Sequence, residues 1–137
     1  MNKYLPDTNI FIHALHGLEP DASFFKRLAE KGEILISPIA IAEFFSKSDL
    51  LEIEEKAFNN FVEEHTVIPI TEDDARIAAS YRKQFLRKTK RTYLTDCFLA
   101  AQAKVHNLVL VTNDLADFPM KDISIISPSA ITLSTRH

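Results

Sequence analysis

Five acidic residues of this chain occupy positions where a carboxylate can do chemistry. Asp7 ends a short apolar run that predicts a strand, and Asp114 follows closely on the apolar run 108–111. Ligands bind at the carboxyl ends of the strands in an open parallel sheet. We therefore expect Asp7 and Asp114 at the ligand-binding edge of a sheet, with Asp117 in the turn that follows.

The other two acids, Glu43 and Asp96, stand inside apolar stretches that predict helices. An ionised carboxylate is costly in such surroundings unless it is paired or bound to a metal. Carboxylates without a cysteine–histidine pattern favour a hard cation, Mg²⁺ or Mn²⁺. The five histidines show no zinc-type spacing with the single Cys97. The acids together therefore predict a magnesium or manganese site.

Each acid also has a purely structural interpretation. Asp7 could cap the helix that follows it, and Asp96 could lie at the N-cap or in the first turn of its helix. Glu43 could pair with Lys47 four residues later. Asp114 and Asp117 could be turn residues. Their joint occurrence at strand ends and in apolar helices favours the metal site over five separate structural roles.

Short apolar strands alternate with amphipathic helices, and this order has to position the acids. The alternation predicts a three-layer α/β/α sandwich with a mainly parallel sheet of four to five strands. One domain over 1–133 and a loose tail over 134–137 are expected. The expected strands are 3–7, 33–37, 66–70, 108–111 and 123–126. The expected helices are 8–15, 21–31, 39–46, 53–64, 72–87 and 93–106.

Local signals support several of these boundaries. Ser37 followed by proline suits the start of a helix, as an N-cap with proline at the first helical position. Thr71, followed by three acids, predicts another helix start. Gly17 permits a break after the first helix, and Gly32 suits a helix C-terminus.

The composition is that of an ordinary globular domain, with 46% hydrophobic and 26% charged residues. One cysteine excludes an internal disulfide and fits a reducing compartment. No apolar run approaches the ~20 residues that cross a membrane, and Asp7 interrupts the N-terminus too early for a signal peptide. We expect a cytoplasmic protein. The net charge of −3 does not suit a protein that simply coats nucleic acid, but it does not exclude a nuclease.

One segment is strongly basic in this acidic chain. Residues 82–91 could guide a phosphate backbone toward the acids. The alternative is a solvated helix face. The basic residues of this segment are Arg82, Lys83, Arg87, Lys88, Lys90 and Arg91.

Four segments of the chain, in order and covering nearly all of it, resemble the PIN-domain family, and within it the VapC-type toxins of toxin–antitoxin pairs. They are Asp7-Thr8-Asn9, Ser37-Pro38 through Ala42-Glu43-Phe44, Thr95 through Ala103, and Val111 through Phe118. The resemblance implies that Asp7, Glu43, Asp96 and either Asp114 or Asp117 bind the metal. It also implies that the polar residues Thr8, Asn9, Thr112 and Asn113 line the site. Pro6 departs from the family pattern, because an apolar strand residue is usual there, and we expect it to shorten the strand's ladder.

The same resemblance implies an Mg²⁺- or Mn²⁺-dependent endoribonuclease that cleaves structured RNA such as transfer or ribosomal RNA. It further implies a cognate antitoxin that covers the site, and a homodimer. The phenylalanine-rich helices between Asp21 and Glu64 could offer the antitoxin an apolar groove. A non-catalytic PIN-like module that binds RNA or protein is the alternative. A dehalogenase-like phosphatase needs a second acid where Asn9 stands, and the acid and lysine pattern of a receiver domain is missing.

Overall fold

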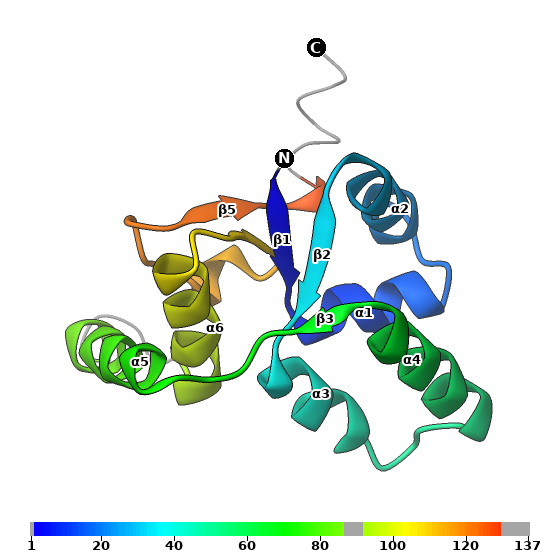
Figure 1. Ribbon diagram of the computed structural model, residues 1–137, viewed down its shortest axis with the longest axis horizontal. Helices are drawn as coiled ribbons and strands as arrows, with labels where there is room; N and C mark the ends of the chain where they lie inside the picture. Colours follow the sequence, from blue (N-terminus) through cyan, green and yellow to red (C-terminus); the bar gives the residue numbers. More distant parts are fainter. Residues whose placement is uncertain (1, 87–91, 130–137) are drawn as a thin grey trace.

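Five short parallel strands form the centre of the computed structural model, which describes residues 2–86 and 92–129 (Figure 1). The strand order is β3-β2-β1-β4-β5, so β1 lies at the middle. The chain steps from β1 to β2 on one side and later returns to β4 on the other. The sheet therefore has its topological switch point between β1 and β4, where open α/β sheets bind ligands. The strands are β1 (Lys3–Pro6), β2 (Glu33–Ile36), β3 (Thr66–Val67), β4 (Val109–Val111) and β5 (Ser124–Ile126).

Helices cover both faces of this sheet, which confirms the predicted α/β/α sandwich. Helices α5 and α6 lie against one face, and α1, α2 and α4 lie on the other side (Figure 1). The helices are α1 (Thr8–Leu15), α2 (Asp21–Lys31), α3 (Pro38–Phe45), α4 (Glu52–Glu64), α5 (Glu72–Phe85) and α6 (Leu94–Val105). No helix in these described ranges is both long and apolar enough to span a membrane.

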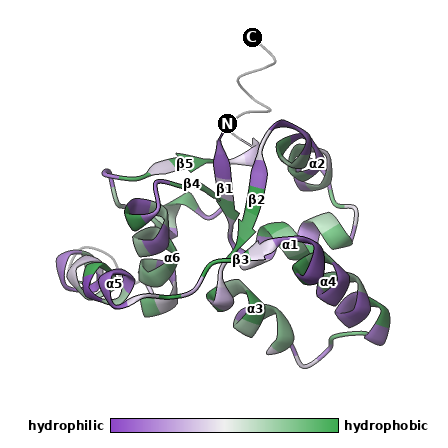
Figure 2. Cartoon of the chain, in the orientation of Figure 1, coloured by the Kyte–Doolittle hydropathy of each residue, from purple (hydrophilic) through white to green (hydrophobic). Residues whose placement is uncertain are grey.

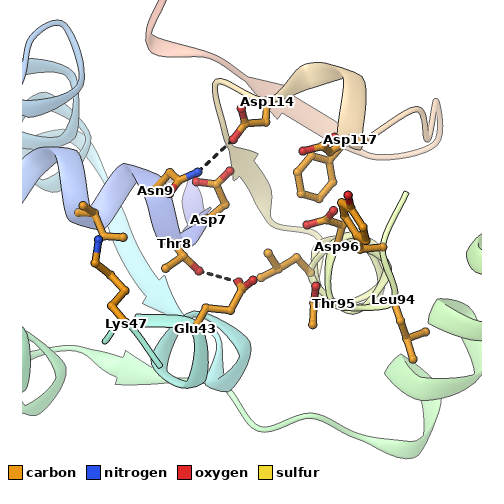
Figure 3. A pocket seen from close by; sticks show the side chains of 14 residues that line it. Asp7, Thr8, Asn9, Glu43, Lys47, Leu94, Thr95, Asp96, Asp114 and Asp117 are labelled. Atoms are coloured by element: carbon orange, nitrogen blue, oxygen red, sulfur yellow. Dashed lines mark hydrogen bonds between the residues drawn. The ribbon is translucent and has the colours of Figure 1, made fainter. Parts of the chain in front are cut away.

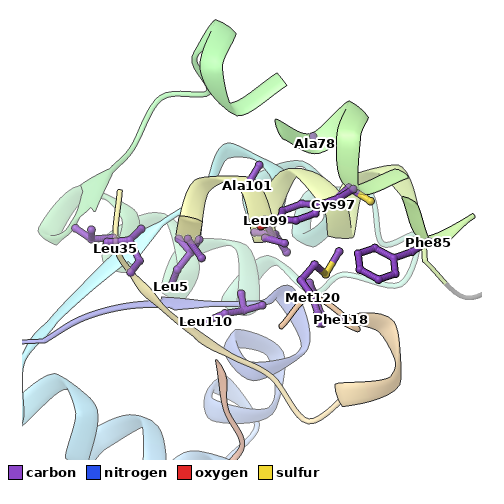
Figure 4. Close-up of a cluster of buried hydrophobic side chains, with 14 residues drawn as sticks. Leu5, Leu35, Ala78, Phe85, Cys97, Leu99, Ala101, Leu110, Phe118 and Met120 are labelled. Atoms are coloured by element: carbon purple, nitrogen blue, oxygen red, sulfur yellow. The ribbon is translucent and has the colours of Figure 1, made fainter. Parts of the chain in front are cut away.

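The alternation of side chains along each strand divides the interior into two cores. Leu5, Leu35 and Leu110 belong to the core that α5 and α6 cover, together with Leu99 and Phe118 (Figure 4). The residues next to them in the strands belong to the other core, which contains a group of phenylalanines. Figure 2 shows that β1 and β2 run from polar starts to apolar ends, so both strands enter the interior as they approach the switch point.

Pro6 is the last residue of β1 and lies opposite Val111 of β4. Proline has no N–H to donate, and the ladder with β2 is formed at Lys3 and Tyr4 only. The ladder with β4 continues, because the N–H of Asp7 donates to the carbonyl of Val111 at 3.0 Å. The strand end that carries Asp7 is therefore fastened to β4 and not to β2.

Most boundaries lie within one residue of the prediction, and three of the differences matter for the sheet or the site. β3 has two residues and not the five of 66–70, because Pro69 cannot continue the ladder; the side-chain amide of Gln102 donates to the Ile68 and Pro69 carbonyls instead. α5 ends at Phe85, before the predicted residue 87. α6 starts at Leu94, so Asp96 lies in its first turn and not in the helix interior.

The predicted helix starts and stops are otherwise present. The Ser37 hydroxyl accepts from the N–H of Ile39, and Thr71 forms a capping box with Asp74. Gly17 has a φ of +68°, which glycine adopts without strain. Gly32 closes α2 in extended conformation, and here space is the requirement: a Cβ atom would lie 2.4 Å from the carbonyl oxygen of Asn2.

Candidate active site

All five acids singled out from the sequence line one pocket of about 650 Å³ at the carboxyl ends of β1 and β4 (Figure 3). They come from four parts of the chain: the β1–α1 junction, α3, the start of α6, and the segment after β4. The other lining residues are Thr8, Asn9, Ile12, Lys47, Tyr93, Leu94, Thr95, Leu99 and Phe118.

Asp7 is both a helix cap and a pocket residue. Its Oδ1 accepts from the N–H of Ile10 at 3.2 Å, and its Oδ2 accepts from the Thr112 hydroxyl. The residue is only 7% exposed. Burial, together with the charges of Asp114 and Glu43, raises the pKa of the Asp7 carboxyl to about 6 despite these two hydrogen bonds.

Glu43 lines the pocket from α3 and is held by Thr8. The Thr8 hydroxyl donates to Oε1 of Glu43 at 2.7 Å, a bond between α1 and α3 (Figure 3). The alternative pairing of Glu43 with Lys47 is not among the ion pairs formed by the described residues. Lys47 lies on the wall of the same pocket instead.

Asp96 enters the pocket from the first turn of α6. The backbone N–H of Tyr93 donates to its carboxylate, as a first-turn acid allows. Burial raises the pKa of Asp96 to about 7, with further contributions from the charges of Asp117, Glu43 and Asp7. A carboxyl whose pKa is raised to near neutral by burial and by neighbouring acids is typical of functional sites.

Asp114 and Asp117 occupy different sides of the pocket. Asp114 accepts from the Asn9 amide at 3.3 Å and its charge acts on Asp7. Asp117 ends the short 3₁₀ turn η1 (Leu115–Asp117), and its charge acts on Asp96. Both acids line the pocket, and metal binding by either of them stays a prediction.

Thr112 and Asn113, predicted to line the site, lie behind it and support its acids. Thr112 donates to Asp7, and its hydroxyl accepts from the N–H of Asp114 at 2.9 Å. The Asn113 amide points away and donates to both oxygens of Asp21, at 2.9 and 2.8 Å. Asp21 is buried and also contacts Nδ1 of His13 at 2.6 Å.

This role of Asp21 was not predicted, since the sequence indicates only that a helix starts at this residue. His13 was considered only as one of five histidines without zinc-type spacing to Cys97. The spacing of His13, Asp21 and Asn113 in the sequence does not indicate that they meet, because their contacts depend on how α1 and α2 pack beside β4.

The predicted basic segment is described only in part. The Arg82 guanidinium donates to the carbonyl of Thr92 at 3.0 Å, so it braces the start of α6. Lys83 is exposed to solvent. The positions Arg87, Lys88, Lys90 and Arg91 lie outside the described residues, and their contact with RNA stays a prediction.

The chemistry of the donor set fits a hard divalent cation. The donors are carboxylate oxygens with hydroxyl and amide oxygens beside them. Neighbouring acids raise the pKa of Asp7 and of Asp96, so a bound cation would relieve this repulsion. With the side chains in their present positions, no three Asp, Glu, His or Cys residues of the described ranges are close enough together to hold an ion. A bound cation would therefore draw the acids inward.

Comparison with known proteins finds one matching domain family and ribonucleases of similar sequence. Residues 4–122 match the model of the PIN domain. The ribonuclease VapC2 of Haemophilus influenzae is 25% identical over 121 residues, which cover 86% of this chain and 91% of the relative. The ribonuclease VapC10 of Mycobacterium tuberculosis is 28% identical over 116 residues, covering 85% and 86%.

Solved structures of similar fold include chains of VapBC2 and FitAcB. A chain of VapBC2 from Rickettsia felis, bound to a promoter DNA fragment, matches with a TM-score of 0.77 at 23% identity, covering 91% of this chain and 98% of that one. A chain of FitAcB from Neisseria gonorrhoeae matches with a TM-score of 0.71 at 24% identity, covering 92% and 98%. At this level of identity the likeness establishes the fold.

Proposed function

Because this chain belongs to the PIN-domain family, as its match over residues 4–122 shows, we propose that it is a divalent-metal-dependent endoribonuclease and the toxin of a toxin–antitoxin pair. PIN ribonucleases generally need a divalent metal, and Mg²⁺ or Mn²⁺ suits an all-oxygen donor set. The metal ligands that we propose are Asp7, Glu43, Asp96 and Asp114, with Asp117 completing the catalytic acids.

The observation that carries this proposal is the convergence of five acids from four chain segments on one pocket. Five separate caps and turns would not need to meet. The burial of the acids, together with the repulsion between them, lowers the free energy of unfolding, because it raises the pKa values of Asp7 and Asp96. A chain keeps such an arrangement for chemistry and not for stability.

The residues of the chain supply orientation and charge. Thr112 holds Asp7, Thr8 holds Glu43, and Asn9 holds Asp114, so each carboxylate has a hydrogen bond that limits its rotation. A divalent cation bound by these acids would lower the pKa of a water molecule and offset negative charge on the phosphodiester. Hydrolysis then needs no histidine base, and His13 is occupied with Asp21.

The partners follow from the same assignment. We propose structured RNA of the transfer or ribosomal class as the substrate, a homodimer as the assembly, and the cytoplasm as the place of action. For the antitoxin we propose the apolar pocket between α1, α2 and α4. That pocket is lined by Phe11, Ala14, Leu15, Ala22, Phe25, Phe58 and Phe61.

The test is cleavage of purified transfer and ribosomal RNA with Mg²⁺ or Mn²⁺, with and without a chelator. Asp7→Asn and Asp96→Asn should each lower the cleavage rate by more than about a hundredfold, since each removes a charged ligand from the site. Circular dichroism should show an unchanged fold.

Exposed acids far from the pocket provide the control. Asp73→Asn on α5 and Glu30→Gln on α2 change the same net charge and should cleave at the wild-type rate. Wild-type cleavage that survives the chelator would exclude the metal mechanism. RNA binding without any cleavage would favour the non-catalytic module.

A further inference from the structure

The acids of the pocket repel the phosphates of an RNA strand. Five carboxylates line the pocket, and an RNA strand brings one more negative charge with each phosphate. Metal ions bound by the acids would offset the negative charge of the scissile phosphate. The neighbouring phosphates need a cation from the protein, or they are repelled by the same acids.

Lys47 meets this need. Among the described residues that line the pocket it is the only lysine or arginine. It lies just beyond α3, on the side of the pocket away from Asp96 and Asp117 (Figure 3). Glu43 accepts its hydrogen bond from Thr8, and Lys47 forms none of the ion pairs among the described residues. The pKa of Glu54, which is not a pocket residue, is lowered by its bonds to His16 and to the N–H of Leu51, and to a smaller extent by the charge of Lys47. The ammonium group of Lys47 can therefore bind a phosphate.

Tyr93 offers a different contact on the opposite wall. It precedes α6 and is bonded there through its backbone: its N–H donates to Asp96 and its carbonyl accepts from Cys97 at 3.0 Å. Its ring is left out of the core, since the residue is 58% exposed and the adjacent Leu94 is 48% exposed. The other two tyrosines, Tyr4 and Tyr81, are buried.

An exposed aromatic ring beside a phosphodiester site is suited to stacking on a base. Such stacking contributes about 1–3 kcal/mol per base and accepts any base, because every base has a π-face. The backbone bonds of Tyr93 to Asp96 and Cys97 fix its main chain at the start of α6, and the residue lines the same pocket as the acids.

We propose that Lys47 and Tyr93 are the substrate-binding residues of this pocket. Lys47 binds a backbone phosphate beside the scissile one on the α3 side, and Tyr93 stacks on a base on the α6 side. The strand is thereby held across the acids at two points. This proposal rests on the proposed function, since it assigns the contacts of that substrate.

Binding is measured first, separately from cleavage. The probe is a 12-nucleotide single-stranded RNA with one 2-aminopurine, bound in Mg²⁺ to the Asp7→Asn protein so that it is not cut. Lys47→Gln should weaken binding and lower the slope of log K against log salt by about 0.7, the value for one lost phosphate contact on a single strand. Lys47→Arg should restore both, and Lys26→Gln on α2 should change neither.

Tyr93 is tested by the quenching of 2-aminopurine, which stacking on the ring produces. Tyr93→Leu should weaken binding about tenfold and abolish the quenching, while Tyr93→Phe should keep both. Both variants should unfold at the wild-type temperature, because the ring is largely outside the core.

The two hypotheses fail separately. If the wild-type protein cleaves RNA while Lys47→Gln and Tyr93→Leu bind and cleave as it does, the binding residues are wrong and the nuclease stands. If the wild-type protein only binds RNA, and these variants weaken that binding, the binding residues stand and the nuclease is wrong. A protein that neither binds nor cleaves RNA overturns both.

Discussion

Asp7 is subject to two opposed requirements. As a cap of α1 it accepts from the N–H of Ile10, which stabilises the helix. As a pocket residue it is buried beside Asp114 and Glu43, and this raises its pKa to about 6 from an ordinary value of 3.8. Without a metal, ionised Asp7 therefore makes the folded state less stable.

The pH dependence of stability follows from the direction of that shift. Asp7 and Asp96, at about 6 and about 7, bind protons more tightly when folded than when unfolded. Their contribution is fully present below the unfolded pKa, near 4, and is lost as the pH rises to between 6 and 7. Metal-free protein should lose unfolding free energy over this window.

Asp7→Asn should remove much of this loss. Its oxygen can still cap α1, but no charge is buried. In chelator at pH 8 we expect the variant to be about 1–3 kcal/mol more stable than the wild type, measured by urea unfolding. At pH 4 the two should be nearly equal. A variant that is less stable than the wild type at both pH values would contradict the claim that ionised Asp7 destabilises the metal-free protein.

For individual residues, the acids of the candidate site could be predicted from residue types and strand ends. The residues that hold the acids in place by hydrogen bonds could not. Asp7 and Asp96 have both the capping or first-turn contacts and the pocket positions that were weighed against each other, because a cap at a strand end also faces the ligand-binding edge. The family resemblance implied that Asn113 lines the site. Its amide turns toward Asp21, a contact that only tertiary packing produces.

Among the elements, the segment after β4 depends most on such hidden support. It carries Asp114 and Asp117, and it has little regular structure beyond one 3₁₀ turn. Asn113 anchors it to α2 through Asp21, and its Oδ1 accepts from the Ser127 hydroxyl at 3.1 Å after β5. Asp21 thus fixes the position of acids that it does not touch.

Asp21→Ala should therefore impair both stability and cleavage. It leaves the Asn113 amide and His13 without their shared acceptor, which costs about 1–3 kcal/mol in urea unfolding. Asn113→Ala should cost a similar amount, and the double variant less than the sum, since both break one contact. Asp73→Ala, an exposed first-turn acid of α5, is the matched control and should stay within about 0.5 kcal/mol. Additive losses would show that Asp21 and Asn113 act independently.

The elements themselves were predicted well where local chemistry decides their ends. Ser37 with its proline and Thr71 with its acids start helices by hydrogen bonds within a few residues. The prediction was wrong at β3, where Pro69 and the distant Gln102 end the strand. Gly32 was correctly placed at a helix end, but its need for space beside Asn2 depends on β1 lying against it.

On the scale of the whole molecule, the pocket lies where the two cores meet. Asp7 and Glu43 come from elements whose apolar residues belong mainly to the phenylalanine-rich core, and Asp96 comes from α6 in the other core. A cation held by all three acids would join these two parts of the molecule. Since it would bind the folded chain and not the unfolded one, it would stabilise the fold.

Divalent ions should consequently raise the unfolding temperature, and more so at high pH. At a hundredfold excess over Kd the gain is about 2.7 kcal/mol, or roughly 8–10 °C for a domain of this size. At pH 5 the shift should be much smaller, because folded Asp7 and Asp96 still hold protons that the cation must displace. Calorimetry with Mg²⁺ and Mn²⁺ at pH 5 and pH 8 measures both effects, and Asp96→Asn should reduce the shift at pH 8 while Asp73→Asn keeps it. An equal shift at both pH values would mean that the ion binds elsewhere than at these two acids.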